Sequence, residues 1–102
     1  MLKNNFMHLE IITPELQIFS GEVEAVKFPG LDGIFQVLQN HSSIISALSK
    51  GEIKVNLLNS FKQDSDASKL IQVDHSNDRL IRIQINGGVM EMLNNKVIVL
   101  AE

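Results

Sequence analysis

The chain has 102 residues, of which 44% are hydrophobic and 21% charged, and its formal net charge is −3. This length suits one domain with a single core and is too short for two ordinary domains. The nine Lys and Arg residues are scattered singly, so nucleic-acid binding is not expected. The absence of cysteine excludes disulfides and thiolate metal sites. We expect residues 1–102 to form one soluble globular domain.

No segment of the sequence has the length and polarity of a membrane anchor or a leader. The longest stretch free of Asp, Glu, Lys and Arg, residues 34–49, has 16 residues and contains several polar side chains. It is too short to cross a bilayer as a helix. The first ten residues, "MLKNNFMHLE", lack the sustained apolar run of a secretory signal.

Apolar residues with a period of two dominate the chain, which predicts half-buried strands. In chain order, strands are expected at residues 8–13, 17–19, 23–28, 34–38, 53–57, 70–73, 81–85, 89–93 and 97–100. Turn-forming residues separate most of them, at Pro14-Glu15, Ser20-Gly21, Pro29-Gly30, Lys50-Gly51, residues 76–78 and Asn94-Asn95. Nine short strands with this spacing predict an all-β sandwich or barrel.

Little or no helix is expected, and the best candidate, residues 42–48, would make barely two turns. Residues 59–69, "NSFKQDSDASK", are polar apart from Phe61 and are expected to form an exposed loop between two strands of a hairpin. Gly87-Gly88 is followed by no helix, so the pair is not expected to hold a phosphate. It is expected to let the chain bend sharply between two sheets.

The sequence contains no convincing catalytic or metal-binding motif. The three histidines, His8, His41 and His75, lie far apart and lack the close spacing of metal ligands. No serine stands in the context of a nucleophile, and the carboxylate pairs are expected on solvated surfaces. We therefore assign no catalytic, cofactor-binding or metal residue. A rival interpretation is a free-standing β-sandwich enzyme or metal-binding domain that uses His41 with His8 or His75.

The segment "FPGLDGIFQVLQNHSSI", residues 28–44, has the features of a docking edge. Pro29 and two glycines favour a tight turn, a strand follows, and residues 39–43 form a polar loop. Asp32 is its one formal charge. Sparsely charged loops on a rigid β scaffold suit contact with another protein better than catalysis.

Two long stretches carry a family resemblance. They are "HLEIITPELQIFSGEVEAVKFPGLDGIFQVLQNHSSIISALSKGEIKV", residues 8–55, and "IQINGGVMEMLNNKVIVLAE", within residues 82–102. The order and spacing of "TPELQIFSGEVE", "PGLDGIFQVL", "ALSKG", "NGGVME" and "NKVIVLA" resemble the epsilon subunit of bacterial F-type ATP synthases. The similarity is to the N-terminal β-sandwich domain of that subunit.

The resemblance implies a flattened two-sheet β-sandwich that serves as a noncatalytic subunit of the central stalk. Such a subunit docks on the gamma subunit and the c-ring, and couples proton-driven rotation to ATP synthesis elsewhere in the complex. It needs no cofactor, and it lies at the cytoplasmic face of the bacterial plasma membrane through the complex. Positions matching Leu31, Asp32, Gly33 and Ile34 lie toward the c-ring in that family. Those matching Thr13, His41 and Ser46 lie on or near the gamma-facing side.

This sequence departs from the family pattern in three places. The family often has an acidic residue where this chain has Ile34, so a charged contact with the c-ring would have to come from Asp32. The segment of residues 59–78 is longer than its counterpart in many relatives and falls outside the resemblance. Many relatives continue into a C-terminal pair of helices that regulates ATP hydrolysis, whereas this sequence ends at Glu102. Inhibition and nucleotide binding by such helices are therefore not expected. A β-sandwich adaptor for some other partner is the remaining alternative.

Overall fold

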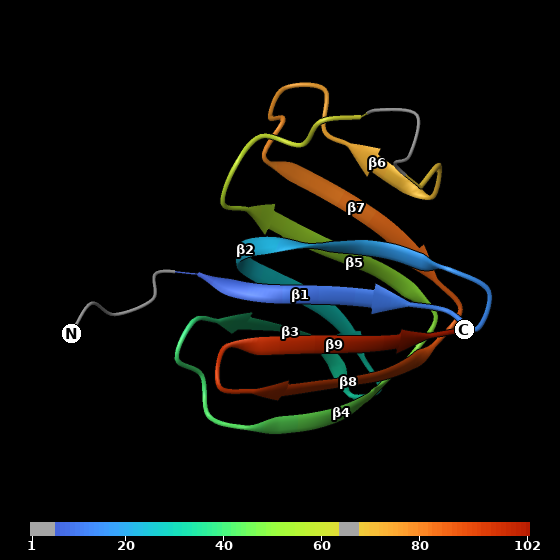
Figure 1. Ribbon diagram of the computed structural model, residues 1–102. Coiled ribbons are helices and arrows are strands. Elements are labelled where there is room, and N and C mark those ends of the chain that lie inside the picture. The colour runs from blue at the N-terminus through green and yellow to red at the C-terminus, as the bar shows by residue number, and fades with distance from the viewer. Residues whose placement is uncertain (1–5, 64–67) are drawn as a thin grey trace.

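The computed structural model describes residues 6–63 and 68–102, and all nine regular elements in these residues are strands (Figure 1). They are β1 (Met7–Ile12), β2 (Gln17–Gly30), β3 (Gly33–Leu38), β4 (Ile44–Leu48), β5 (Gly51–Leu57), β6 (Ile71–Val73), β7 (Leu80–Ile85), β8 (Gly88–Leu93) and β9 (Lys96–Ala101). The all-β prediction is therefore confirmed. The described ranges contain no helix that could cross a membrane.

The strands form two layers that share β2. The front sheet has the order β2-β1-β9-β8-β4, and the back sheet has the order β3-β2-β5-β7-β6. The first half of β2 pairs with β1, whereas its second half pairs with β3 and β5. A register shift between Val23 and Ala25 marks the change of partners. Such a bulge bends a strand and increases its twist, which lets β2 pass from one layer to the other.

The core lies between the two layers and is built by the alternating residues of each strand. Met7, Leu9 and Ile11 of β1 are fully buried, and they alternate with partly exposed residues. Ile81 and Ile83 of β7 are buried from the opposite layer. Met90 and Met92 are also buried, which confirms that they fill the core. The alternation of apolar and polar residues along each strand therefore sets which face of each sheet is buried in the core.

Two local predictions were wrong, and one strand was not predicted. Ser20-Gly21 is not a turn, because β2 runs without interruption from Gln17 to Gly30. Residues 42–48, the best candidate for a short helix, contain none, in agreement with the expectation of little or no helix, and Ile44–Leu48 form the unpredicted strand β4, which pairs with β8. Residues 59–69 do not link a hairpin, because β5 and β6 both pair with β7, which lies between them. Of that loop, residues 64–67 lie outside the described residues.

The predictions from the asparagine pair and the glycine pair are confirmed. Asn94 and Asn95 have φ of 51° and 62° and form the tight turn between β8 and β9. Gly87 and Gly88, with φ of 140° and 150°, join β7 of the back sheet to β8 of the front sheet. A Cβ atom on Gly88 would lie 2.3 Å from the carbonyl oxygen of Leu100. The crossing between the layers therefore requires glycine at this position.

The variant Gly88→Ala should lower the free energy of unfolding by more than about 3 kcal/mol, because it adds a backbone clash to an unfavourable φ. Gly33→Ala is the matched control, since Gly33 has φ of 130° but a Cβ atom added there would have no neighbour within 4 Å. It should cost only the conformational strain of roughly 1–3 kcal/mol. Urea unfolding followed by circular dichroism measures both, and equal losses would contradict the clash.

Candidate docking surface

The β2–β3 hairpin projects hydrophobic side chains into solvent at its tip. Leu31 and Asp32 form the turn, and Gly33 supplies the positive φ that closes it. Pro29 and Gly30 belong to β2 rather than to the turn, which corrects their predicted position. Leu31 and Ile34 are 66% and 79% exposed. The sequence prediction of an exposed, weakly charged turn is confirmed.

Packing behind the tip explains why these side chains face outward. Phe35 packs against the fully buried Phe28, with ring centroids 5.5 Å apart, and Val37 is fully buried. Since side chains alternate along a strand, Phe35 and Val37 anchor β3 to the core and turn Ile34, Gln36 and Leu38 outward. The core thus fixes the direction of the exposed face.

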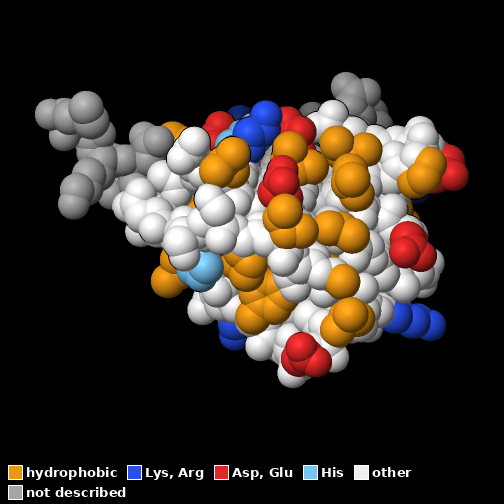
Figure 2. All heavy atoms as spheres, turned by 90° about the horizontal axis from the view of Figure 1, so that it is seen from below, with side chains coloured by type: hydrophobic (Ala, Val, Ile, Leu, Met, Phe, Trp, Pro, Cys, Tyr) orange, Lys and Arg blue, Asp and Glu red, His pale blue; other side chains and the backbone are white. Residues whose placement is uncertain are grey.

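A groove of about 460 Å³ lies between the β2–β3 hairpin tip with the start of β3 and the middle of β4. It is lined by residues 30–35 and 45–47. Ile45, on the β4 side, is 71% exposed. Asp32 is the single charged residue among the described residues that line the groove. Figure 2 views the molecule from below and shows hydrophobic side chains gathered on this side, with few charged groups among them.

The outer face of the front sheet carries a continuous apolar row that the sequence analysis missed. Ala47, Val89, Leu100 and Ile12 stand in register across β4, β8, β9 and β1. The next row alternates hydrophobic and acidic residues: Ile45, Glu91, Ile98 and Glu10. The sequence signal for this row was "KVIVLA" of β9, which is apolar both at the positions that face the core and at those that face outward. Contiguous exposed apolar residues of this kind typically mark an interaction surface.

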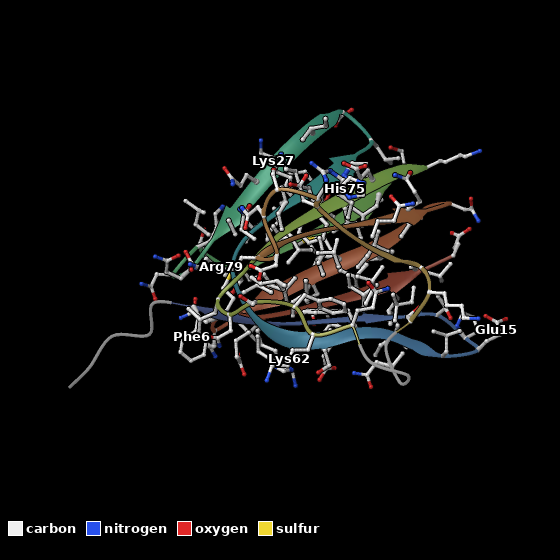
Figure 3. The ribbon with its side chains drawn as sticks, turned by 90° about the horizontal axis from the view of Figure 1, so that it is seen from above. Phe6, Glu15, Lys27, Lys62, His75 and Arg79 are labelled. Carbon is white, nitrogen blue, oxygen red and sulfur yellow. The ribbon has the colours of Figure 1, made fainter. Side chains whose placement is uncertain are left out.

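The outer face of the back sheet has the opposite character. Arg82 of β7 forms ion pairs with Glu52 of β5, at 3.7 Å, and with Asp74 after β6, at 2.9 Å. Figure 3, seen from above, shows Lys27 and His75 on this side of the molecule. Hydrogen bonds from Ser76, and then the Arg82 guanidinium, lower the pKa of Asp74 from its ordinary value of 3.8 to about 2. This face is built for contact with water.

The three residues predicted to face gamma do not come together at one point. Thr13 lies in the β1–β2 turn, where its hydroxyl hydrogen-bonds with the backbone of Leu16. His41 is exposed in the loop after β3, which is held to the β8–β9 turn by Asn40 and Asn95. That turn lies beside His8, at the far end of β1 from Thr13. Figure 3 shows this separation, because Glu15 of the β1–β2 turn and Phe6 lie at opposite ends of the molecule.

Ser46 occupies the core-facing side of β4, where it is half-buried between the exposed Ile45 and Ala47. Its hydroxyl donates to the carbonyl oxygen of Ala47, at 3.2 Å. The three residues predicted to face gamma therefore lie at the two ends of the front sheet and at its β4 edge.

The histidines of the rival interpretation occupy separate parts of the fold. His8 lies on the outer face of β1, His41 follows β3, and His75 follows β6. His8 contacts two carboxylates, with its ring nitrogens 3.4 Å from Glu10 and Glu22. No group of three His, Asp or Glu side chains in residues 6–63 and 68–102 is arranged to hold a metal ion.

Fold and surface together define a β-sandwich with one polar sheet face and one side that exposes apolar residues. Residues 6–65 match the family described as "ATP synthase, Delta/Epsilon chain, beta-sandwich domain". The chain is 37% identical over 94 residues to the ATP synthase epsilon chain of Chlorobium limicola, covering 92% of this chain and 86% of that protein. It is 34% identical over 96 residues to the epsilon chain of Campylobacter curvus, covering 94% of this chain and 60% of that one. The chain therefore belongs to the ATP synthase delta/epsilon family, and resembles the epsilon chain, a noncatalytic subunit.

Solved structures support the fold at lower sequence identity. One chain of the Euglena gracilis mitochondrial ATP synthase superimposes with a TM-score of 0.73 at 15% identity, over 96% of this chain and 51% of that chain. A chain from the Tetrahymena thermophila mitochondrial ATP synthase central stalk and c-ring gives a TM-score of 0.66 at 12% identity, over 99% and 66%. The β-sandwich is thus shared across distant sequences.

The contacts of Asp74 predict a dependence of stability on pH. Because its pKa is lower in the folded state, the ionised carboxylate stabilises the fold above pH of about 4, and this contribution is lost as the pH falls toward about 2. Asp74→Asn should therefore be less stable than wild type near pH 6, and the difference should shrink toward about pH 2. Urea unfolding at both pH values measures it. A difference that does not change with pH would contradict the role of the carboxylate.

Proposed function

We propose that this chain is a central-stalk subunit of a proton-translocating F-type ATP synthase, in which residues 1–102 act as a single domain. It docks on the gamma subunit and on the c-ring, and so couples proton-driven rotation to ATP synthesis at sites in other subunits. Its own role is to supply contact area and stiffness.

The proposal is carried by one observation: in a member of the epsilon family, highly exposed Ile34 and Ile45 line the same groove. Exposed hydrophobic residues that gather in this way favour burial against a partner. Among the described residues, the outer face of the back sheet instead carries the ion pairs of Arg82 with Glu52 and Asp74.

The two partners are assigned to two parts of this docking side. The hairpin tip, Leu31 to Ile34, is proposed to contact the c-ring. The front sheet, bounded by Thr13, His41 and Ser46, is proposed to contact gamma. A stable contact of this kind buries on the order of 1,200–2,000 Å² in total and has a hydrophobic centre within a polar rim. Glu10 and Glu91, in the row next to the apolar row, supply polar groups beside it.

Docking on the c-ring would hold the subunit at the membrane without a membrane-spanning segment of its own. For a bacterial complex, the corresponding position is the cytoplasmic face of the plasma membrane.

Ile34→Asp should weaken binding to a purified gamma–c-ring rotor by about 2–4 kcal/mol, because it places a charge in the apolar centre of the contact. Folding should be unaffected, since Ile34 is 79% exposed. Leu70→Asp is the matched control, because Leu70 is 51% exposed on the back-sheet side and should bind normally. Fluorescence titration of labelled variants measures the affinity. Equal binding by both variants would place the contact elsewhere.

His41→Ala should weaken binding to isolated gamma by less than about tenfold, as expected for a polar residue at the rim of an interface. His75→Ala, which changes an exposed histidine after β6, is the control and should bind gamma like wild type. Isothermal titration calorimetry with gamma distinguishes the two. Unchanged affinity in both variants would remove His41 from the proposed gamma surface.

A further inference from the structure

We propose that the groove between β3 and β4 receives an extended segment of gamma, which pairs through its backbone with the free edge of β3. The inference rests on the proposed function and adds a mode of binding: the partner extends the back sheet by one strand. It follows from the direction of backbone groups in β3, from the composition of this edge and from the lining of the groove.

Two hydrogen bonds fix which backbone groups of β3 point toward its free edge. The N–H of Ser49 donates to the carbonyl oxygen of Pro29, at 2.8 Å, so this carbonyl points away from β3. Pro29 is paired with Ile34, which makes this a pair without mutual hydrogen bonds. At the other end of β3, the carbonyl oxygen of Leu38 accepts from His41, at 3.2 Å, rather than from β2.

Hydrogen-bonded and non-hydrogen-bonded pairs alternate along an antiparallel ladder. The N–H and C=O groups of Ile34 and Gln36 therefore point away from β2, toward the free edge of β3, and the groove borders this edge at Ile34. Within residues 6–63 and 68–102, β3 pairs with β2 alone, so these groups have no strand partner. A second strand supplies donors and acceptors at the matching spacing of two residues.

The edge of β3 lacks the features by which proteins usually protect an open edge. Such edges are commonly very short or carry charged residues or proline. The six residues of β3, Gly33 to Leu38, include neither a charge nor a proline, and Ile34 and Leu38 are exposed. The opposite edge of the back sheet, β6, has only three residues. Of the two edge strands of the back sheet, only β3 therefore offers a longer edge that is uncharged and accessible.

The groove also indicates the chemistry of the inserted segment. Ile45 lines the wall opposite β3, which favours apolar side chains at alternate positions of the segment. Asp32, the single charge among the described lining residues, lies in the tip that is proposed to contact the c-ring, so no charged side chain is required of the inserted segment. Gamma is the chosen partner because Ile45 also belongs to the outer face of the front sheet, which is proposed to contact gamma.

The pair Gln36→Pro and Gln36→Ala tests the backbone contact directly. Both variants remove the side chain, but only proline removes the N–H that lies at the free edge of β3. The β2–β3 ladder should survive in both, because this N–H makes no bond to β2. Affinity for gamma should fall about tenfold or more for Gln36→Pro and stay within about twofold of wild type for Gln36→Ala. Equal affinities of the two folded variants would overturn the proposal.

Amide hydrogen exchange of the wild-type chain, followed by NMR, gives a test that does not depend on a variant. The amides of Ile34 and Gln36 should exchange rapidly in the isolated chain and at least about tenfold more slowly with gamma bound. If gamma binds and both amides remain fast, strand addition is wrong while the proposed function stands. Protection by a c-ring or by a second copy of the chain, but not by gamma, would overturn the assignment to gamma. Failure of gamma to bind would overturn both proposals.

Discussion

The path of β2 is the constraint on which the docking side depends. Its 14 residues pair first with β1 in the front sheet, and then with β3 and β5 in the back sheet. β3 therefore leaves the hairpin within the back sheet, whereas β4 joins β8 in the front sheet. A single pairing, Gly30 with Leu48, holds β2 and β4 together at the tip. Beyond that point β3 and β4 diverge, and the groove is the space between them.

The two sheets share one core but present different outer surfaces. Ion pairs of Arg82 cover part of the back sheet, while the apolar row from Ala47 to Ile12 crosses the front sheet. This asymmetry is expected of a domain that is bound on one side and solvated on the other. It also explains why the structure carries conspicuous hydrophobic exposure without an enclosed catalytic pocket among the described residues. In such a subunit, function lies in the shape and polarity of a surface rather than in reactive groups.

Alternation in the sequence predicted the strands well, because each sheet buries one face and the pattern records it directly. It failed where a strand bends or packs irregularly. β2 was divided at Ser20-Gly21, since the glycine resembles a turn signal while the observed chain continues through a twisted strand. β4 was not predicted as a strand, because "SSIISAL" lacks strict alternation of apolar and polar residues. The groove was beyond sequence reasoning, since Ile34 and Ile45 come to line it only through the pairings of β3 with β2 and of β4 with β8.

The central claim is that this β-sandwich is built to bind gamma, and size-exclusion chromatography tests it most directly. The chain would be run with the gamma subunit from the same cells, and each protein would also be run alone. The account predicts co-elution at equal stoichiometry in a peak earlier than either protein alone. Separate elution of two folded proteins would contradict the claim.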